Sequence, residues 1–426
     1  MNKRTKTALR RWCLYGWTFA KWTMAASAIG VVCGLIGTMF HFGVHEVTAF
    51  RGTHPWVLYL LPLAGFVIVS FYKLTETDGL GTDDIIDAVH EGKRLPILLL
   101  PAIFFGTVLT HLCGGSAGRE GAALQMGGTI GQCMGRTFRL DDRDLRVATL
   151  AGMAAFFSAL FGTPLAATVF AIMVISIGVI YHVALYPSLL AALVAYGVSV
   201  RLGVEPTRFT VAVPDQSVGM FVRVAALGVL CALVSILFCK LMHGAGHLMK
   251  RIKNPWLRVI CGGFAVIALT WIFGTDYNGA GMDIVTRAIE QETVAVPWAF
   301  LLKLVFTAVT LAAGFKGGGV VPSFFVGATF GCAVSPLLGL PVGFGAAVGL
   351  AAVFCGVTNC PVASTLLAVE LFGAEGMLYF ALACCLSYML SGYQGLYSSQ
   401  TILYSKLKAQ FINVHTNAYH AGEKTE

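Results

Sequence analysis

The chain has 426 residues, of which 57% are hydrophobic and 12% are charged, and its mean hydropathy is +0.77. Roughly a quarter of the residues of a soluble globular protein are charged, so this composition excludes an ordinary soluble domain and predicts a polytopic α-helical membrane protein. The basic residues behind the formal net charge of +8 flank apolar runs instead of forming one patch, which argues against a nucleic-acid-binding module.

The N-terminal segment 1–22 is basic and precedes the first apolar run. Its basic residues are Lys3, Arg4, Lys6, Arg10, Arg11 and Lys21. Cytoplasmic segments carry such an excess of Lys and Arg, so we expect this segment, and with it both termini, to be cytoplasmic. A cleaved signal peptide is the alternative, but the apolar run 24–47 is longer than the apolar part of such a peptide. We expect a retained first helix, in the inner membrane if the source is a bacterium.

The cysteines and histidines give no sign of a metal site. Twelve cysteines are scattered through apolar runs without a CxxC motif, and we expect them to be small buried hydrophobic residues. His243 and His247 have the i, i+4 spacing of a possible metal pair, but no HExxH context accompanies them. We predict neither a metal nor a cofactor.

The first half of the chain contains an interrupted helix. After apolar runs at 56–72 and 97–112, separated by an acidic polar segment at 75–96, comes the glycine-rich turn GGSAGREG at 114–121. The next apolar segment, 122–134, is too short to cross about 30 Å of hydrocarbon at about 1.5 Å per residue. Such irregular backbone survives in a membrane only where protein or a water-filled cavity covers it.

Glu120, inside this turn, points most directly to function. A carboxylate at membrane depth costs a few kcal/mol or more and usually belongs to a proton or ion pathway. The surrounding glycines leave backbone N–H groups bare for a small anion. We expect Glu120 to be a gate that competes with the anion for these N–H groups when deprotonated and withdraws when protonated. An ion pair with Arg119 is the structural alternative.

The second half of the chain repeats the first. Residues that recur at an offset of 200 are Gly79, Gly81, Asp83, Ala88, Gly114, Gly118, Gly127 and Gly131, and those that recur at an offset of 197 are Gly152, Ala154, Ala155, Phe157, Pro164, Ala166 and Thr168. Constant offsets over two long stretches indicate an internal duplication. We place the membrane repeats at 23–200 and 217–408, with a connecting segment at 201–216 and a cytoplasmic tail at 409–426.

Matching glycine interruptions in duplicated halves point to a transport site at the midplane. In the second turn, residues 317–322, Val320 stands opposite Glu120 in the repeat register. Each helix N-terminus carries about half a unit of positive charge, so the two helices that follow the turns favour a small anion. The residues expected to hold it are Gly118, Arg119, Gly121, Gly318, Gly319, Val320 and Val321.

These residues resemble the CLC family of anion channels and anion/proton exchangers, over nearly the whole chain. Residues 118–122 match the GREGP segment, whose glutamate gates the external side, with alanine for proline. Residues 318–322 match the GxFxP segment with valine for phenylalanine, and Tyr397 in GLYSSQ matches the C-terminal tyrosine. The resemblance implies an all-α inverted repeat with broken helices, transport of a halide and protons, and a homodimer with one pathway in each subunit.

The departures from the family bear on the anion. The serine that contacts the central ion in the family's GSGIP segment aligns with Leu80, so its hydroxyl is lost. Together with GGSAGREG, GFKGG and the 359–361 step Asn-Cys-Pro, this resembles the fluoride-exporting branch, although that branch tends to have a charged or polar residue at the position of Gly319. Chloride and fluoride are both candidates for the transported anion.

The sequence offers two positions for a second acid of the pathway. The inner proton-transfer glutamate of family exchangers falls near Met173 and Val174, whereas the symmetry-related position is Glu370. We expect Glu370 to be a second proton carrier, with a cap of the next helix or an interface contact as the alternative. A passive channel, favoured by Met173, is the alternative to proton-coupled transport.

Two further residues have paired interpretations. Tyr397 either holds the inner end of the anion site with its hydroxyl or belongs to an interfacial aromatic belt. Asn359 either offers its amide to the anion or caps a helix. Ser116 with His111 is the pair that an intramembrane hydrolase would need, but the duplication gives no reason for an enzyme, and we expect none.

Overall fold

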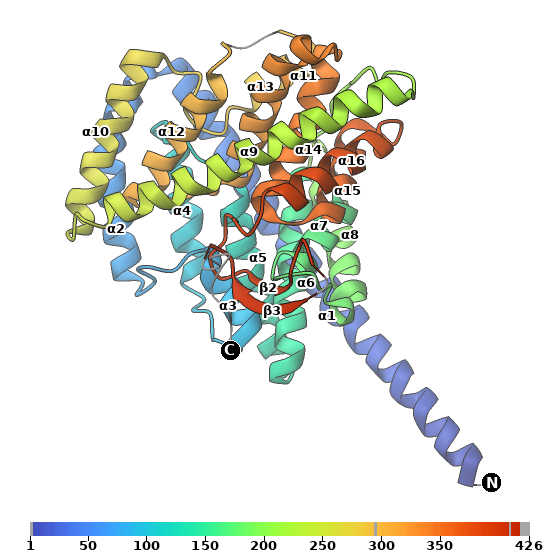
Figure 1. The fold of residues 1–426 in the computed structure, drawn as a ribbon. Coiled ribbons are helices and arrows are strands. Elements are labelled where there is room, and N and C mark those ends of the chain that lie inside the picture. The colour runs from blue at the N-terminus through green and yellow to red at the C-terminus, as the bar shows by residue number, and fades with distance from the viewer. Residues whose placement is uncertain (1–2, 294–295, 409, 418–426) are drawn as a thin grey trace.

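Helices make up almost all of the structure. The computed structural model describes residues 3–293, 296–408 and 410–417. Within these ranges the α-helices (Figure 1) are α1 Lys3–Thr53, α2 Leu61–Leu74, α3 Thr82–Glu91, α4 Leu99–Leu112, α5 Glu120–Thr137, α6 Asp142–Phe161, α7 Pro164–Met173, α8 Leu185–Arg201, α9 Val218–Met249, α10 Pro255–Phe273, α11 Met282–Glu290, α12 Ala299–Ala313, α13 Val320–Leu338, α14 Val342–Thr358, α15 Pro361–Phe372 and α16 Met377–Leu390. Two short 3₁₀ helices, Pro55–Leu60 and His182–Ala184, join them. The expected all-α fold is confirmed.

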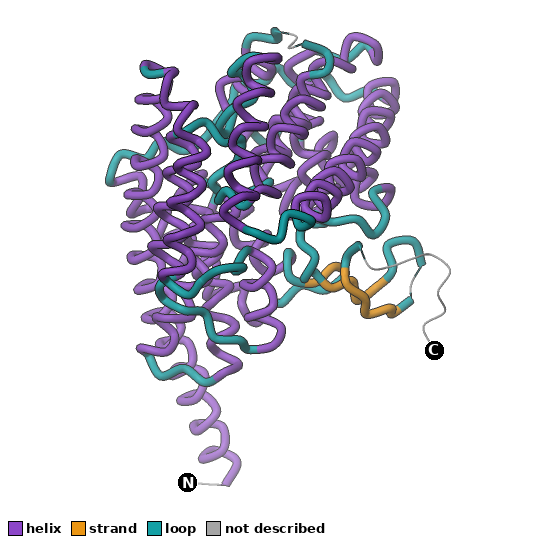
Figure 2. Tube along the Cα trace, turned by 90° about the vertical axis from the view of Figure 1, so that its left-hand side faces the viewer, coloured by secondary structure: helices purple, strands orange, loops and turns teal. Residues whose placement is uncertain are grey.

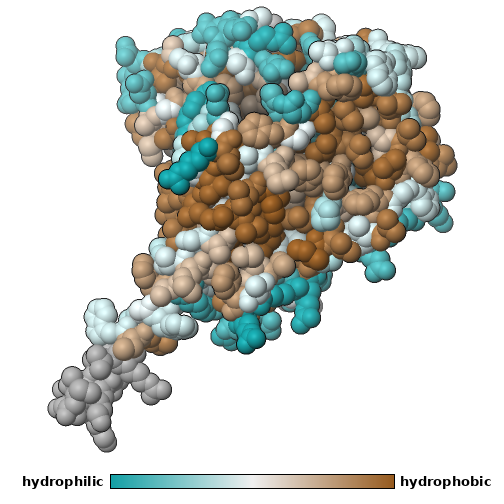
Figure 3. Space-filling view, turned by 180° about the vertical axis from the view of Figure 1, so that it is seen from behind, coloured by the Kyte–Doolittle hydropathy of each residue, from teal (hydrophilic) through white to brown (hydrophobic). Residues whose placement is uncertain are grey.

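Seven of the described helices are long and apolar enough to cross a membrane. The first predicted span is among them, because α1 continues without a break through residues 24–47. Large apolar side chains such as Leu63, Phe66, Leu233 and Phe264 are exposed on the outside of the bundle. Figure 3 shows a broad apolar band between two more hydrophilic ends. Such a band fits lipid, and the multi-pass membrane prediction is confirmed.

Helices of the two halves begin at matching positions. The starts of α3, α4 and α5 recur 200 residues later as the starts of α11, α12 and α13, and the start of α7 recurs 197 residues later as that of α15. In Figure 1, α3 lies near the bottom of the molecule and α11 near the top, as an inverted relation requires. Residues 202–217 join α8 to α9. The exact repeat boundaries, 23–200 and 217–408, stay a prediction.

Glycines let the central helices pack backbone against backbone. A Cβ atom on Gly131 of α5 would lie 2.1 Å from the carbonyl oxygen of Ala148 on α6, and one on Gly331 of α13 would lie 2.1 Å from the carbonyl oxygen of Gly345 on α14. Small residues allow such close approach between membrane helices. These two helix pairs form the buried centre and support the turns that begin α5 and α13.

A small sheet at one end of the molecule was not expected from the sequence. Strand β2 (Thr401–Tyr404) pairs in parallel with β1 (Ser176–Ile177) and antiparallel with β3 (Phe411–His415), and Figure 2 shows the strands outside the helical bundle. Residues 410–417 therefore fold back instead of forming the start of a free tail. The rest of the predicted tail, residue 409 and residues 418–426, lies outside the described residues.

Gly131→Ala tests the close approach of α5 and α6. The added methyl group would overlap the Ala148 carbonyl, and overpacking of this kind costs about 1–3 kcal/mol. We expect a lower thermal unfolding midpoint in detergent, measured by fluorescence-detected size exclusion.

Gly197→Ala in α8 is the matched control, because a Cβ there meets no atom within 4 Å. Equal midpoints for the two variants would contradict the packing argument.

Candidate functional site

The two glycine-rich turns are joined to each other at the centre of the molecule. The amide of Gly118 donates to the carbonyl of Gly318, and the amide of Gly318 donates to the carbonyl of Gly118, both at 2.8 Å. This reciprocal pair brings the N-termini of α5 and α13 together. The N–H groups of Gly118 and Gly318 are used in the bridge, so the expectation that they contact an anion directly does not fit this geometry.

The bridge depends on residues without side chains. A Cβ atom on Gly121 would lie 2.8 Å from Cα of Gly318, and a Cβ on Gly318 would lie 2.3 Å from the amide nitrogen of Gly121. Gly317 has a φ of +152°, which disfavours other residues. Glycine is therefore required here by the contact between the turns as well as by the exposure of N–H groups.

Glu120 lies in this centre and not toward lipid. Its side chain is completely buried, and Oε2 accepts a hydrogen bond from the amide of Val321 at 3.1 Å. The other oxygen, Oε1, has no hydrogen-bond partner among the described residues. The carboxylate thus occupies the N-terminus of α13, where a small anion would bind.

Arg119 does not form the ion pair considered for Glu120. Its guanidinium contacts Nδ1 of His41 at 3.0 Å and the carbonyl of Leu160 at 3.5 Å, and it lies over the ring of Phe161. Among the salt bridges of the described residues, none joins Arg119 to Glu120. The charge of Arg119 therefore acts near the site without neutralising the carboxylate through contact.

Tyr397 is buried with its hydroxyl free. Its Oη has no hydrogen-bond partner among the described residues, whereas its carbonyl accepts from Oγ1 of Thr416 at 2.6 Å. A buried phenol without a hydrogen-bond partner is costly unless a ligand or water provides one.

Leu80, which stands where the family has serine, lies half-buried just before α3. Asp83 on α3 accepts the amide of Ser399 at 3.1 Å, which brings a carboxylate to the Tyr397 segment.

Asn359 is occupied by structural contacts. Its side-chain amide donates to the carbonyl of Gln394 at 3.0 Å and to Oε1 of Gln400 at 3.1 Å, while its oxygen accepts from Lys406. The backbone is left-handed, with φ of +61°, and ends α14. These contacts fit a helix-ending and segment-anchoring role better than an anion contact.

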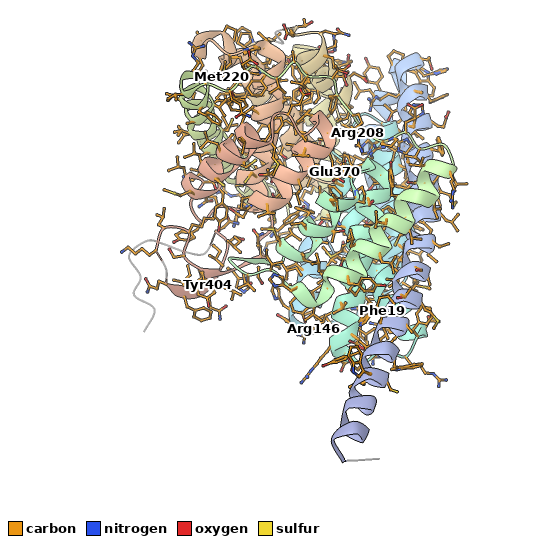
Figure 4. All side chains as sticks on the ribbon, turned by 90° about the vertical axis from the view of Figure 1, so that its right-hand side faces the viewer. Phe19, Arg146, Arg208, Met220, Glu370 and Tyr404 are labelled. Carbon is orange, nitrogen blue, oxygen red and sulfur yellow. The ribbon has the colours of Figure 1, made fainter. Side chains whose placement is uncertain are left out.

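Glu370 caps a helix of the other half. Its two carboxylate oxygens accept the amides of Leu165 at 3.1 Å and Ala166 at 2.8 Å, at the N-terminus of α7. Figure 4 shows Glu370 on the same side of the molecule as Arg208, whose guanidinium donates to the carbonyl of Gly162 just before α7. The geometry is that of a helix cap, but the capped helix is α7 of the first half and not the next helix, as the alternative from the sequence had it. Met173 is at the far end of α7.

A cavity of about 720 Å³ opens beside Glu120 and Val321. Its walls carry basic side chains that the sequence alone did not single out, and carboxylates as well. The basic ones are His41, His45, Arg51 and Arg287, beside Arg119 and His111, and the carboxylates are those of Asp276 and Asp283. Arg51 donates to the carbonyl of His111 at 2.7 Å. For His41, His45 and Arg51 the sequence signal was a basic residue within the long helix α1. Arg287 lies on α11, which carries other charged residues, and gave no such signal.

Lys303 is a second feature that sequence reasoning missed. It is fully buried on α12, and its ammonium donates to the carbonyls of Tyr277 at 3.1 Å and Gly279 at 2.6 Å. These bonds fix the segment in front of α11 that forms part of the cavity wall. A lysine inside an otherwise apolar helix was the available signal.

The residues suggested for hydrolysis are not paired. The hydroxyl of Ser116 bonds to Oγ1 of Thr307 at 3.0 Å, and Nδ1 of His111 bonds to the carbonyl of Thr107 at 2.9 Å. His111 therefore does not act on Ser116 in this arrangement.

Known proteins with similar sequences identify the family of this chain. Residues 63–392 match the family model described as voltage gated chloride channel. The "Chloride/fluoride channel protein" of Pseudomonas syringae pv. tomato is 38% identical over 399 residues, which cover 91% of this chain and 88% of that protein. The chain therefore belongs to the voltage-gated chloride channel family, the CLC family that its motifs resemble.

Other relatives of the chain are described as exchangers. A crystal structure of a CLC-type fluoride/proton antiporter aligns with a TM-score of 0.88 and 32% identity, over 91% of this chain and 99% of that one. The H(+)/Cl(-) exchange transporter ClcA of Vibrio campbellii is 25% identical over 382 residues, 81% of each chain. A slow cyanobacterial Cl-/H+ antiporter, 19% identical, has the same fold with a TM-score of 0.76 over 87% of this chain and 94% of that one.

Replacement of Glu370 tests the cap. Glu370→Ala removes both acceptors from the N-terminus of α7, and loss of such a cap costs about 1–2 kcal/mol, so we expect lower stability to urea in detergent. Glu370→Gln, which keeps one oxygen acceptor, should lose less.

The exposed Glu375→Ala on the next loop is the control. If Glu370→Ala kept its stability but lost transport, the proton-carrier interpretation would replace the cap.

Proposed function

We propose that this protein carries a small halide anion across the membrane in exchange for protons, with Glu120 as the shared gate. The observation that supports this most directly is the hydrogen bond from the Val321 amide to the Glu120 carboxylate at the N-terminus of α13. A carboxylate and a halide have the same charge and accept the same N–H group. Only one of them can occupy this position at a time.

Protonation links the two ions. A neutral carboxylic acid is a much weaker acceptor than a carboxylate, so binding of a proton to Glu120 weakens its hold on α13 and leaves the amides to the anion. The large cavity next to Glu120 offers the side chain room to withdraw. The anion occupies these amides while Glu120 is protonated, and the carboxylate that returns after proton loss displaces it, so the anion and the carboxylate use the site in turn.

The contacts of the anion are proposed from the donors that remain. The N–H groups of Gly319, Val320 and Val321 at the N-terminus of α13, with Gly121 next to the bridge, are the outer contacts. The hydroxyl of Tyr397, which has no partner among the described residues, is the inner one. Gly118 and Gly318 do not contact the anion but align α5 and α13 through their mutual hydrogen bonds. Asn359 acts indirectly as well, because its hydrogen bonds to Gln394 and Gln400 hold the segment that contains Tyr397.

Fluoride is the substrate we favour, with chloride as the competing anion. Leu80 cannot donate the hydrogen bond that a serine gives in chloride-conducting family members. The 38% identical relative is described as a chloride/fluoride channel, and the 32% identical structure as a fluoride/proton antiporter. Both descriptions agree with a site that has few side-chain donors.

A passive channel is the second candidate, and one observation favours it. Glu370 is used as a cap and Met173 cannot carry a proton, so neither position provides an inner acid. Asp83, next to the Tyr397 segment, is the carboxylate that remains for this role in an exchanger.

We further propose a homodimer with both termini in the cytoplasm, in the inner membrane if the source is a bacterium. The exposed apolar residues Leu165, Val362 and Leu378 lie on α7, α15 and α16, where a second subunit or lipid would cover them. The basic segment before the first span supports the proposed orientation.

Glu120→Gln tests the exchange mechanism. Glutamine mimics the protonated acid, so we expect proton uptake driven by an anion gradient in liposomes to fall below about a tenth of the wild-type rate, while anion flux continues. Fluoride and chloride flux are measured side by side with ion-selective electrodes, and proton uptake with a pH electrode.

Glu46→Gln, an exposed glutamate on α1, is the control. Wild-type proton uptake in Glu120→Gln would overturn the gate, and no proton uptake in the wild type would indicate the passive channel.

Tyr397→Phe tests the inner contact. A hydrogen bond to an anion is worth about 1.5–3 kcal/mol, so the dissociation constant of the anion should rise at least tenfold in isothermal titration with fluoride. Tyr404→Phe, at an exposed tyrosine on β2, is the control. An unchanged anion affinity in Tyr397→Phe would mean that Tyr397 belongs to the interfacial aromatic belt or only packs against its neighbours.

A further inference from the structure

A second cavity, remote from Glu120, lies where α3 ends, α5 ends and α6 begins. It has a volume of about 220 Å³, and three arginines contribute to its lining: Arg94, Arg136 and Arg146. Figure 4 places Arg146 at the end of the bundle from which the N-terminal part of α1 projects. The cavity is therefore at the membrane face that we propose to be cytoplasmic.

The walls of this cavity are fixed by hydrogen bonds. Gln132 of α5 accepts the amide of Leu95 and donates to the carbonyl of Lys93, both at 2.8 Å, and its oxygen also receives the guanidinium of Arg136. Gly92, with a left-handed φ of +73°, ends α3 and turns the chain into this segment. The shape of the cavity is therefore held by hydrogen bonds between Gln132 and the backbone of residues 93–95, and not by flexible side chains alone.

The charges in the cavity are not balanced. Among the salt bridges of the described residues, none includes Arg94, Arg136 or Arg146. Asp142 is the acidic residue among the lining residues. Nε of Arg146 is buried and has no hydrogen-bond partner among the described residues. A buried donor without an acceptor is costly, so the cavity needs an anion or ordered water.

We propose that this cavity binds a phosphate group, and that its usual occupant is the headgroup of an anionic phospholipid. Guanidinium groups bind phosphate through paired N–H donors, and basic pockets between membrane helices on the cytoplasmic side hold such headgroups. A volume of about 220 Å³ exceeds the roughly 30 Å³ share of one water several-fold. This leaves room for a phosphate and its glycerol.

The apolar part of the lining favours a lipid over a free phosphate. Leu140 and Leu145 contribute to the wall. These side chains would meet the glycerol and the first acyl carbons while the arginines hold the phosphate. The occupant would bind the end of the same helix, α5, that begins with Glu120.

The test uses stability and bound mass, so it does not depend on the proposed transport. Purified full-length protein in neutral detergent receives dihexanoyl phosphatidylglycerol, dihexanoyl phosphatidylcholine or inorganic phosphate. We expect a saturable rise of several degrees in the unfolding midpoint with phosphatidylglycerol, none with phosphatidylcholine, and a bound phosphatidylglycerol in native mass spectra. The same rise with inorganic phosphate alone would confirm the phosphate site but overturn lipid as its occupant.

Arg146→Gln and Arg143→Gln form a matched pair of variants on α6. Each removes one positive charge, but Arg143 is exposed and does not line the cavity. We expect Arg146→Gln, and the exposed Arg94→Gln, to weaken phosphatidylglycerol binding at least tenfold, while Arg143→Gln stays near wild type. Equal losses in Arg146→Gln and Arg143→Gln, or equal binding of the two lipids, would overturn the proposal. Arg94→Gln keeps the test valid if Arg146→Gln fails to fold.

Discussion

Two helices begin against each other in the interior of the membrane, and the rest of the protein serves this contact. The reciprocal bonds between Gly118 and Gly318 satisfy two amides that lipid could not satisfy. They also align the N-termini of α5 and α13, so the remaining free amides face one region. Because the turns touch at backbone distance, the helices that follow them must also pack closely, and the glycine contacts of α5 with α6 and α13 with α14 provide this support.

The buried cations near Glu120 share one property, which is that backbone carbonyls accept their hydrogen bonds. Lys303 donates to the carbonyls of Tyr277 and Gly279, and Arg51 donates to the carbonyl of His111. Carbonyl dipoles satisfy the hydrogen bonds of a cation without cancelling its charge. These cations therefore act on Glu120 through a low dielectric, in which charges interact over longer distances than in water. Asp276 and Asp283 in the wall of the cavity beside Glu120 oppose them.

The carboxylates in the interior divide into two kinds according to their partners. Glu370 bonds to two amides of α7 and completes a helix end. Glu120 bonds to one amide and has a second oxygen without a partner among the described residues, beside a cavity. A fully satisfied carboxylate stabilises structure, whereas an incompletely satisfied one can exchange partners. This difference, more than membrane depth, separates the cap at Glu370 from the proposed gate at Glu120.

The sequence by itself determined the membrane class and the duplication, and it singled out Glu120 as the residue on which the proposed function depends. Each of these depends on composition or on a periodic match along the chain, and a carboxylate in a glycine-rich turn between apolar runs is visible without coordinates. The family followed from the same motifs. Only the tertiary structure decided the partners: that Gly118 and Gly318 bond to each other, that Asn359 holds Gln394 and Gln400, and that Arg119 reaches His41 instead of Glu120. The physical reason is that a side chain or amide forms hydrogen bonds with the groups that the fold brings near it, here from 35 to 200 positions away along the chain. A single sequence does not state which distant residues become neighbours.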